Sequence, residues 1–260
     1  MKLCIAQTDI VWEDKAENMR RSRIIMQTAA EQGAQLVVFP ELSLTGFTMN
    51  TALAEPPDGC TVQFFSDLTR ELGTAAAFGF ACEYDGVVTN RLCIAEKGSI
   101  IAEYDKLHPF SYGGECAAYS AGNRLVTAEV CGETVGLTVC YDLRFPEIFQ
   151  ALSDSCTLII TSANWPESRR EHWQTLLKAR AIENQCYIAG CNRCGTGNGL
   201  NYSGDSAVYS PSGELIAAAE PYREQLIFSE IKHEECRAVR EAFPVKNDRR
   251  LDLYKNFYAR

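Results

Sequence analysis

The chain has 260 residues, of which 46% are hydrophobic, and a formal net charge of −9 at pH 7. That length fits one large domain or two small ones, and the hydrophobic share is enough for a substantial core. The negative charge argues against nucleic acid or an anionic membrane surface as a partner, because both need clustered Lys and Arg. No apolar stretch approaches the roughly 20 residues that a membrane helix needs.

Helices and strands are predicted in chain order from hydrophobic periodicity and from Gly and Pro stop signals. The predicted helices cover residues 14–32, 61–72, a short stretch ending at about 152, and 168–184. The predicted strands cover residues 2–7, 36–40, 75–83, 89–95, 99–104, 134–139, 157–162, 186–191, 206–210, 214–219 and 225–231. Residues 96–98 and 211–213 predict hairpin turns, and the glycine-rich run 195–199 predicts a flexible loop near a cleft.

This mixture of spaced helices and short strands, several of them apolar on both faces, predicts a layered α/β architecture with sheets between helices. Hairpins interrupt the alternation of strand and helix, which argues against a plain doubly wound sheet. No repeat or linker interrupts the chain, so we expect a single domain over residues 1–260.

The first strand begins at residue 2 and leaves no room for a signal peptide, so we expect a cytoplasmic protein. The 12 cysteines are scattered, mostly in apolar runs, and we interpret most of them as small buried residues kept reduced. Cys191 and Cys194 form a C-x-x-C pair, but no second pair or nearby His completes a zinc site. We therefore expect no metal.

Three reactive side chains follow apolar strands. Cys140 ends the run 134–139, Glu41 follows the run 36–40, and Lys106 comes soon after the run 99–104. A thiol, a carboxylate and an ammonium at strand ends are the groups that thiol-based acyl transfer requires. Taken singly, Glu41 could be an ordinary loop carboxylate and Lys106 a surface lysine.

Three motifs argue against this interpretation of Glu41 and Lys106, because together they resemble the nitrilase (carbon–nitrogen hydrolase) superfamily. They are VVFPELSLTG around Glu41, YDKLHPF around Lys106 and TVCYDLRFPE around Cys140, in the family's order and at about its spacing. The resemblance implies a four-layer α-β-β-α sandwich. It also implies no cofactor, and a homodimer or larger homo-oligomer in which a C-terminal extension from about residue 235 packs at the dimer interface.

The same resemblance implies roles for the site residues. Cys140 would be the nucleophile and Glu41 the base that takes its proton. Lys106 and the backbone N–H of Tyr141 would stabilise the oxyanion. Glu115, in YGGECAAY, matches a second family glutamate near the lysine, although the preceding loop varies in length.

The segment from SANWPESRREHW to NYSGDS is most similar to the omega-amidase branch, which hydrolyses the terminal amide of 2-oxoglutaramate or 2-oxosuccinamate. Such a small-molecule substrate requires a cation for its distal carboxylate, and Arg144 and Arg169 are the candidates. Trp165 and Phe110 are candidates for the pocket wall, and Tyr141 is a further candidate for binding the substrate. Each of these side chains could equally serve in a structural ion pair or in the core.

Three alternatives stay open. The first keeps the chemistry but changes the substrate to deaminated glutathione or an N-carbamoyl amine. The second is a catalytically silent binding protein with the same fold, which the intact Glu41, Lys106 and Cys140 argue against. The third is a redox protein that uses Cys191 and Cys194.

Overall fold

The computed structural model describes residues 1–258 and contains two six-stranded sheets and one two-stranded ribbon. The first sheet has the order β14 (Gln225–Glu230), β1 (Lys2–Gln7), β2 (Leu36–Val38), β3 (Ala75–Tyr84), β4 (Val87–Glu96), β5 (Ser99–Asp105). The second has the order β13 (Leu215–Ala218), β12 (Ala207–Tyr209), β9 (Tyr187–Asn192), β8 (Leu158–Ala163), β7 (Glu133–Val139), β6 (Thr127–Val130).

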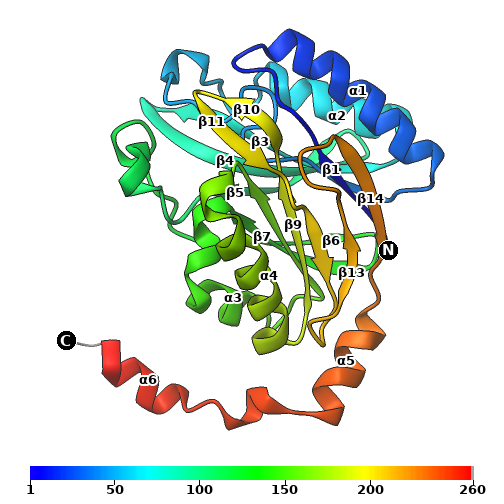
Figure 1. Cartoon of the computed structure of the whole chain (residues 1–260), viewed down its shortest axis with the longest axis vertical. Coiled ribbons are helices and arrows are strands. Elements are labelled where there is room, and N and C mark those ends of the chain that lie inside the picture. The colour runs from blue at the N-terminus through cyan, green and yellow to red at the C-terminus, as the bar shows by residue number, and fades with distance from the viewer. Residues whose placement is uncertain (259–260) are drawn as a thin grey trace.

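Helices cover the outer face of each sheet (Figure 1). Helices α1 (Lys15–Glu31) and α2 (Cys60–Leu72) lie on the first sheet, and α3 (Pro146–Leu152) and α4 (Arg170–Asn184) lie on the second. The four-layer α-β-β-α sandwich predicted from the sequence is therefore confirmed. Among residues 1–258, no helix is long and apolar enough to cross a membrane.

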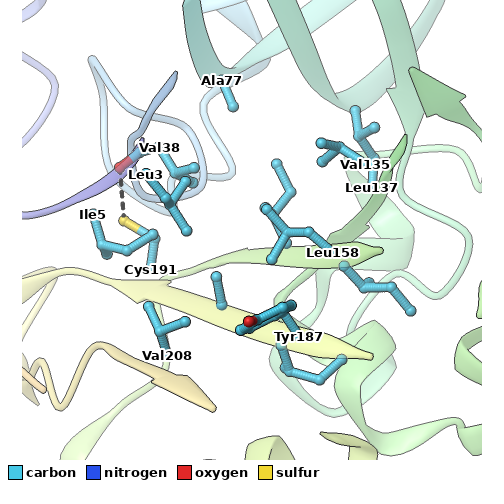
Figure 2. Packing of buried hydrophobic residues seen from close by; sticks show 14 of the residues in the cluster. Leu3, Ile5, Val38, Ala77, Val135, Leu137, Leu158, Tyr187, Cys191 and Val208 are labelled. Carbon is cyan, nitrogen blue, oxygen red and sulfur yellow. Dashed lines mark hydrogen bonds between the residues drawn. The ribbon is translucent and has the colours of Figure 1, made fainter. Parts of the chain in front are cut away.

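The core lies between the two sheets (Figure 2). Leu3 and Ile5 point from β1 toward the second sheet, whereas Cys4 and Ala6 pack on the other face with α1 and α2. Both faces of this strand are buried, which explains its continuous apolar run. The Cys191 thiol crosses the layer and donates a hydrogen bond to the Val38 carbonyl at 3.2 Å.

The central strands of each sheet are parallel, and this arrangement creates the site. In the first sheet β1, β2 and β3 run parallel, and in the second β7, β8 and β9 run parallel. The carboxyl ends of parallel strands meet at one edge of a sheet. Glu41 follows β2, Cys140 follows β7 and Asn164 follows β8, so residues far apart in the chain converge there.

The segment after Arg193 differs from its prediction. The expected flexible loop is instead the ribbon of β10 (Cys194–Gly197) and β11 (Leu200–Ser203). Its turn, Asn198-Gly199, has positive φ at both residues, which is the conformation that a two-residue hairpin of right-handed twist needs. Strand β6 was also missed by the sequence patterns.

The C-terminal segment has two parts. Helix α5 (His233–Ala242) docks on its own subunit, where Cys236 is buried and the Arg240 guanidinium donates to the carbonyls of Ser153 and Cys156 at 3.0 and 3.1 Å. Helix α6 (Leu251–Tyr258) extends away from the sheets (Figure 1) and exposes Phe257. The packing of the C-terminal extension from about residue 235 at a dimer interface stays a prediction.

Candidate active site

Cys140 occupies a strained turn at the end of β7. Its φ is +47°, a left-handed conformation that costs a non-glycine residue about 1–3 kcal/mol. The turn continues as the 3₁₀ helix Cys140–Arg144, and the buried Asp142 carboxylate holds it. That carboxylate accepts hydrogen bonds from the Val139 N–H at 2.9 Å and from the Tyr104 hydroxyl at 2.7 Å.

Glu41, Lys106 and Glu115 form one buried cluster. The Lys106 Nζ lies 2.9 Å from Glu41 Oε1 and 2.8 Å from Glu115 Oε2. Both glutamate side chains are 0% exposed and the lysine side chain is 1% exposed. A buried ammonium is stable only when paired, and here two carboxylates pair with it. The structure therefore brings together the lysine and both glutamates that the motifs singled out.

The charges of this cluster act on Lys106 and Cys140. Burial opposes a charge on Lys106, but the Glu41 and Glu115 carboxylates outweigh it and raise the pKa of the ammonium above its ordinary value. Burial, reinforced by the Glu41 charge, raises the pKa of the Cys140 thiol well above its ordinary value, and Lys106 only partly opposes this. The thiol is thus protonated at neutral pH and needs a base as it attacks.

Two asparagines fix the Glu41 carboxylate. The Asn164 N–H donates to Glu41 Oε2 at 2.9 Å, and the Asn164 side-chain amide donates to the Glu41 carbonyl at 2.6 Å. The Asn90 amide donates to Glu41 Oε1 at 2.8 Å and to Glu115 Oε1 at 2.9 Å. Asn164 directly follows the end of β8, whereas Asn90 lies inside β4 and was missed by the sequence patterns. A polar amide inside an otherwise apolar strand was the signal available for it.

A pocket opens directly over Cys140 and contains about 420 Å³ of empty volume, its mouth included. All five residues predicted for the substrate side line it, together with six others. The lining residues are Phe47, Phe110, Cys140, Tyr141, Arg144, Asn164, Trp165, Pro166, Arg169, Leu200 and Tyr202. Of these, Phe47, Pro166, Leu200 and Tyr202 were not predicted. The last two come from β11, whose hairpin turn went unrecognised.

Arg144 and Arg169 present two positive charges to this pocket. The Arg144 guanidinium lies 4.6 Å from the Trp165 ring centroid, and the Arg169 guanidinium lies 5.3 Å from the Phe110 ring centroid. Among residues 1–258, neither guanidinium forms an ion pair with a carboxylate. Burial and the neighbouring Arg169 charge lower the pKa of Arg144, as expected for two cations that lack an anion between them.

Two histidines and the C-x-x-C pair do not line this pocket. The His108 Nδ1 atom forms a hydrogen bond with Asp142 Oδ1 at 2.8 Å. The His172 Nδ1 atom lies 3.3 Å from the Arg144 guanidinium. Cys191 and Cys194 are free and buried, and burial raises the pKa of the Cys194 thiol to about 12, contrary to what redox motifs require. Within the described part of the chain, no three His, Cys, Asp or Glu residues are grouped as metal ligands.

A family model described as carbon-nitrogen hydrolase matches residues 2–241, and the chain belongs to this family. The family and its omega-amidase and 2-oxoglutaramate amidase relatives define it as an amidase, a hydrolase of carbon–nitrogen bonds other than peptide bonds. The sequence prediction of this enzyme class is confirmed.

Individual relatives match over nearly their whole length. Omega-amidase YafV of Escherichia coli is 37% identical over 249 residues, which cover 95% of this chain and 96% of that protein. The 2-oxoglutaramate amidase of Bacillus subtilis is 35% identical over 254 residues, covering 95% and 97%. The crystal structure of XC1258 from Xanthomonas campestris, a CN-hydrolase superfamily protein with an arsenic adduct in its active site, superposes with a TM-score of 0.90 at 34% identity, covering 96% and 97%.

Proposed function

We propose that this amidase hydrolyses the terminal amide of a small dicarboxylic monoamide, of the 2-oxoglutaramate or 2-oxosuccinamate type, through a thioester on Cys140. The observation that carries the proposal is the pocket over the thiol, which adds to its apolar walls Arg144 and Arg169, neither of them ion-paired with a carboxylate of residues 1–258. The reacting amide lies at the thiol, and the guanidinium groups bind the distal carboxylate. The omega-amidase and 2-oxoglutaramate amidase relatives support the same substrate class.

The first half of the reaction forms the thioester. Glu41 takes the proton of the Cys140 thiol while the sulfur attacks the amide carbon, and the carbonyl electron pair moves onto oxygen. The Lys106 ammonium and the Tyr141 N–H stabilise this oxyanion. The tetrahedral intermediate then collapses, the carbon–nitrogen bond breaks, and Glu41 returns its proton to the nitrogen, which leaves as ammonia.

The second half releases the acid. Water enters the position that ammonia left, gives a proton to Glu41 and attacks the thioester carbon. The carbon–sulfur bond breaks, the sulfur takes back the proton, and the dicarboxylate product departs. Glu115 holds the opposite side of the Lys106 ammonium, so that the lysine stays charged in the buried site through both halves.

The pocket chemistry also predicts discrimination among amides. An ammonium group at carbon 2, as in glutamine, would lie beside two guanidinium groups with no free carboxylate to bind it. An amide without the distal carboxylate, such as pentanamide, would leave both guanidinium groups unpaired. We therefore expect ammonia release from 2-oxoglutaramate to exceed release from glutamine and from pentanamide.

The test is ammonia release by the purified protein with these three amides, together with mass spectrometry of the protein during turnover. A thioester on the peptide that carries Cys140 is expected, and Cys140→Ala abolishes both signals. Cys131→Ala, at an exposed cysteine in the turn between β6 and β7, is the matched control. Release from a larger amide such as deaminated glutathione, with none from 2-oxoglutaramate, would refute the substrate assignment. No release from any amide would favour a silent binding protein.

A further inference from the structure

The Asn90 side chain joins the two buried carboxylates of the site. Asn90 lies on β4, is 1% exposed, and uses one amide nitrogen for both contacts. That nitrogen lies 2.8 Å from Glu41 Oε1 and 2.9 Å from Glu115 Oε1. A carboxylate only accepts hydrogen bonds, so the NH₂ end of the amide must face both glutamates, with one hydrogen for each.

The backbone of Asn90 reaches the third member of the cluster. The Lys106 N–H donates to the Asn90 carbonyl at 2.9 Å, which fixes the start of the segment that carries the lysine. One residue thus contacts Glu41, Lys106 and Glu115, which come from three separate parts of the chain.

The amide is retained at a cost to stability. Its own Oδ1 is buried and has no hydrogen-bond partner among residues 1–258. An unpaired buried carbonyl oxygen destabilises the fold, and an apolar side chain at this point of a buried strand would avoid that loss. Packing alone therefore does not explain an asparagine here.

We propose that Asn90 is a positioning residue of the amidase reaction, which holds the Glu41 and Glu115 carboxylates at fixed points on the Lys106 ammonium through both proton transfers. The inference rests on the proposed function, in which Glu41 moves the proton. A neutral donor suits this task, because it orients two anions without changing the charge of the cluster. Lysine at this point would pair with the carboxylates itself, and aspartate would repel them.

Other titratable groups also face the cluster and must be considered in any test that varies pH. They are the Cys140 thiol and the hydroxyl groups of Tyr119 and Tyr202, each of which is electrostatically coupled to the cluster. All three are neutral at pH 6–8, because burial raises the pKa of each. These three groups therefore contribute no change of charge to the profile between pH 6 and 8.

The experiment compares Asn90→Asp and Asn90→Ser with the parent in the pH dependence of kcat/KM. Asn90→Asp keeps the shape but adds a third carboxyl group, so the cluster binds an extra proton near neutral pH. The ratio of kcat/KM at pH 8 to that at pH 6 is expected to rise about tenfold. Asn90→Ser loses a donor to a charged group, and kcat is expected to fall about tenfold to hundredfold with little change in KM. Asn184→Asp, at a fully buried amide on α4, should leave the profile unmoved.

A second measurement needs no turnover. The pH dependence of iodoacetamide alkylation is followed on the peptide that carries Cys140, and its midpoint is expected at higher pH in both Asn90 variants but not in Asn184→Asp. Unmoved midpoints and an unmoved kcat/KM profile in a folded variant would overturn the proposal. If Asn90→Asp does not fold, the alkylation midpoint and the kcat/KM profile of Asn90→Ser alone decide. An inactive parent with a shifted alkylation midpoint would refute the proposed substrate and leave this inference standing.

Discussion

Replacing Lys106 by methionine tests whether the buried cluster is a balanced set of charges. Methionine keeps most of the side-chain volume but leaves the Glu41 and Glu115 carboxylates, both 0% exposed, without their cation. Breaking a buried ion pair in this way costs about 3–5 kcal/mol in the free energy of unfolding. For a domain of this size that lowers Tm by roughly 6–20 °C. Loss of an oxyanion donor should also reduce kcat by about 10²–10³.

The assay is urea unfolding at pH 8, followed by tryptophan fluorescence, for Lys106→Met and for the double variant Lys106→Met/Glu115→Gln. The double variant removes one of the two uncompensated charges, so it should recover part of the lost stability without recovering activity. Lys178→Met, at an exposed lysine of α4, should stay within about 0.5 kcal/mol of the parent. A Lys106→Met protein as stable as the parent to within about 1 kcal/mol would refute the reasoning.

Three further predictions concern the turn, the pocket and the core. Asp142→Asn removes the charged acceptor that holds the nucleophile turn, so kcat should fall about tenfold or more with little change in KM, and an unchanged kcat would contradict this. Arg144→Met and Arg169→Met should each raise KM for 2-oxoglutaramate about tenfold or more but leave the slow turnover of pentanamide unaltered, and equal effects on both amides would argue for a structural role. Burial raises the pKa of Cys4 and of Cys194 to about 12, so above the unfolded-state value of about 8.5 the unfolded chain loses protons that the folded chain keeps. Stability should therefore be full below about pH 8 and fall as pH rises, by about 1.4 kcal/mol for each such thiol at pH 9.5, and a urea midpoint that does not change between pH 7.5 and 9.5 under reducing conditions would contradict the burial of these thiols.

The chemistry of the site was largely predictable from local sequence. Cys140 and Glu41 directly follow continuous apolar runs, and such runs form buried parallel strands whose carboxyl ends share one edge. The motifs around these residues and Lys106 indicated the family, and with it the four layers. The residues expected on the substrate side all line the pocket, because they follow shortly after the ends of β5, β7 and β8.

Other features depend on contacts between distant parts of the chain. The core-facing side of α1 includes two polar residues, Asn18 and Ser22, which the structure buries beside Met26 and Ala29. The Asn18 amide donates to the carbonyls of Val11 and Leu44, at 2.7 and 2.8 Å, and these acceptors make a polar residue stable inside. A pattern scored by hydrophobicity alone contains no information about such partners.

Local sequence and long-range contacts thus account for different parts of the site. Residue order and apolar pattern determined which strands form and which reactive groups follow them. The packing of the two sheets brings Asn90 against Glu41 across 49 residues of chain, and it places no carboxylate of residues 1–258 in an ion pair with Arg144 or Arg169. Hydrogen bonds and ion pairs depend on distances of about 3–4 Å between side chains. Those distances are set only when the two sheets pack against each other.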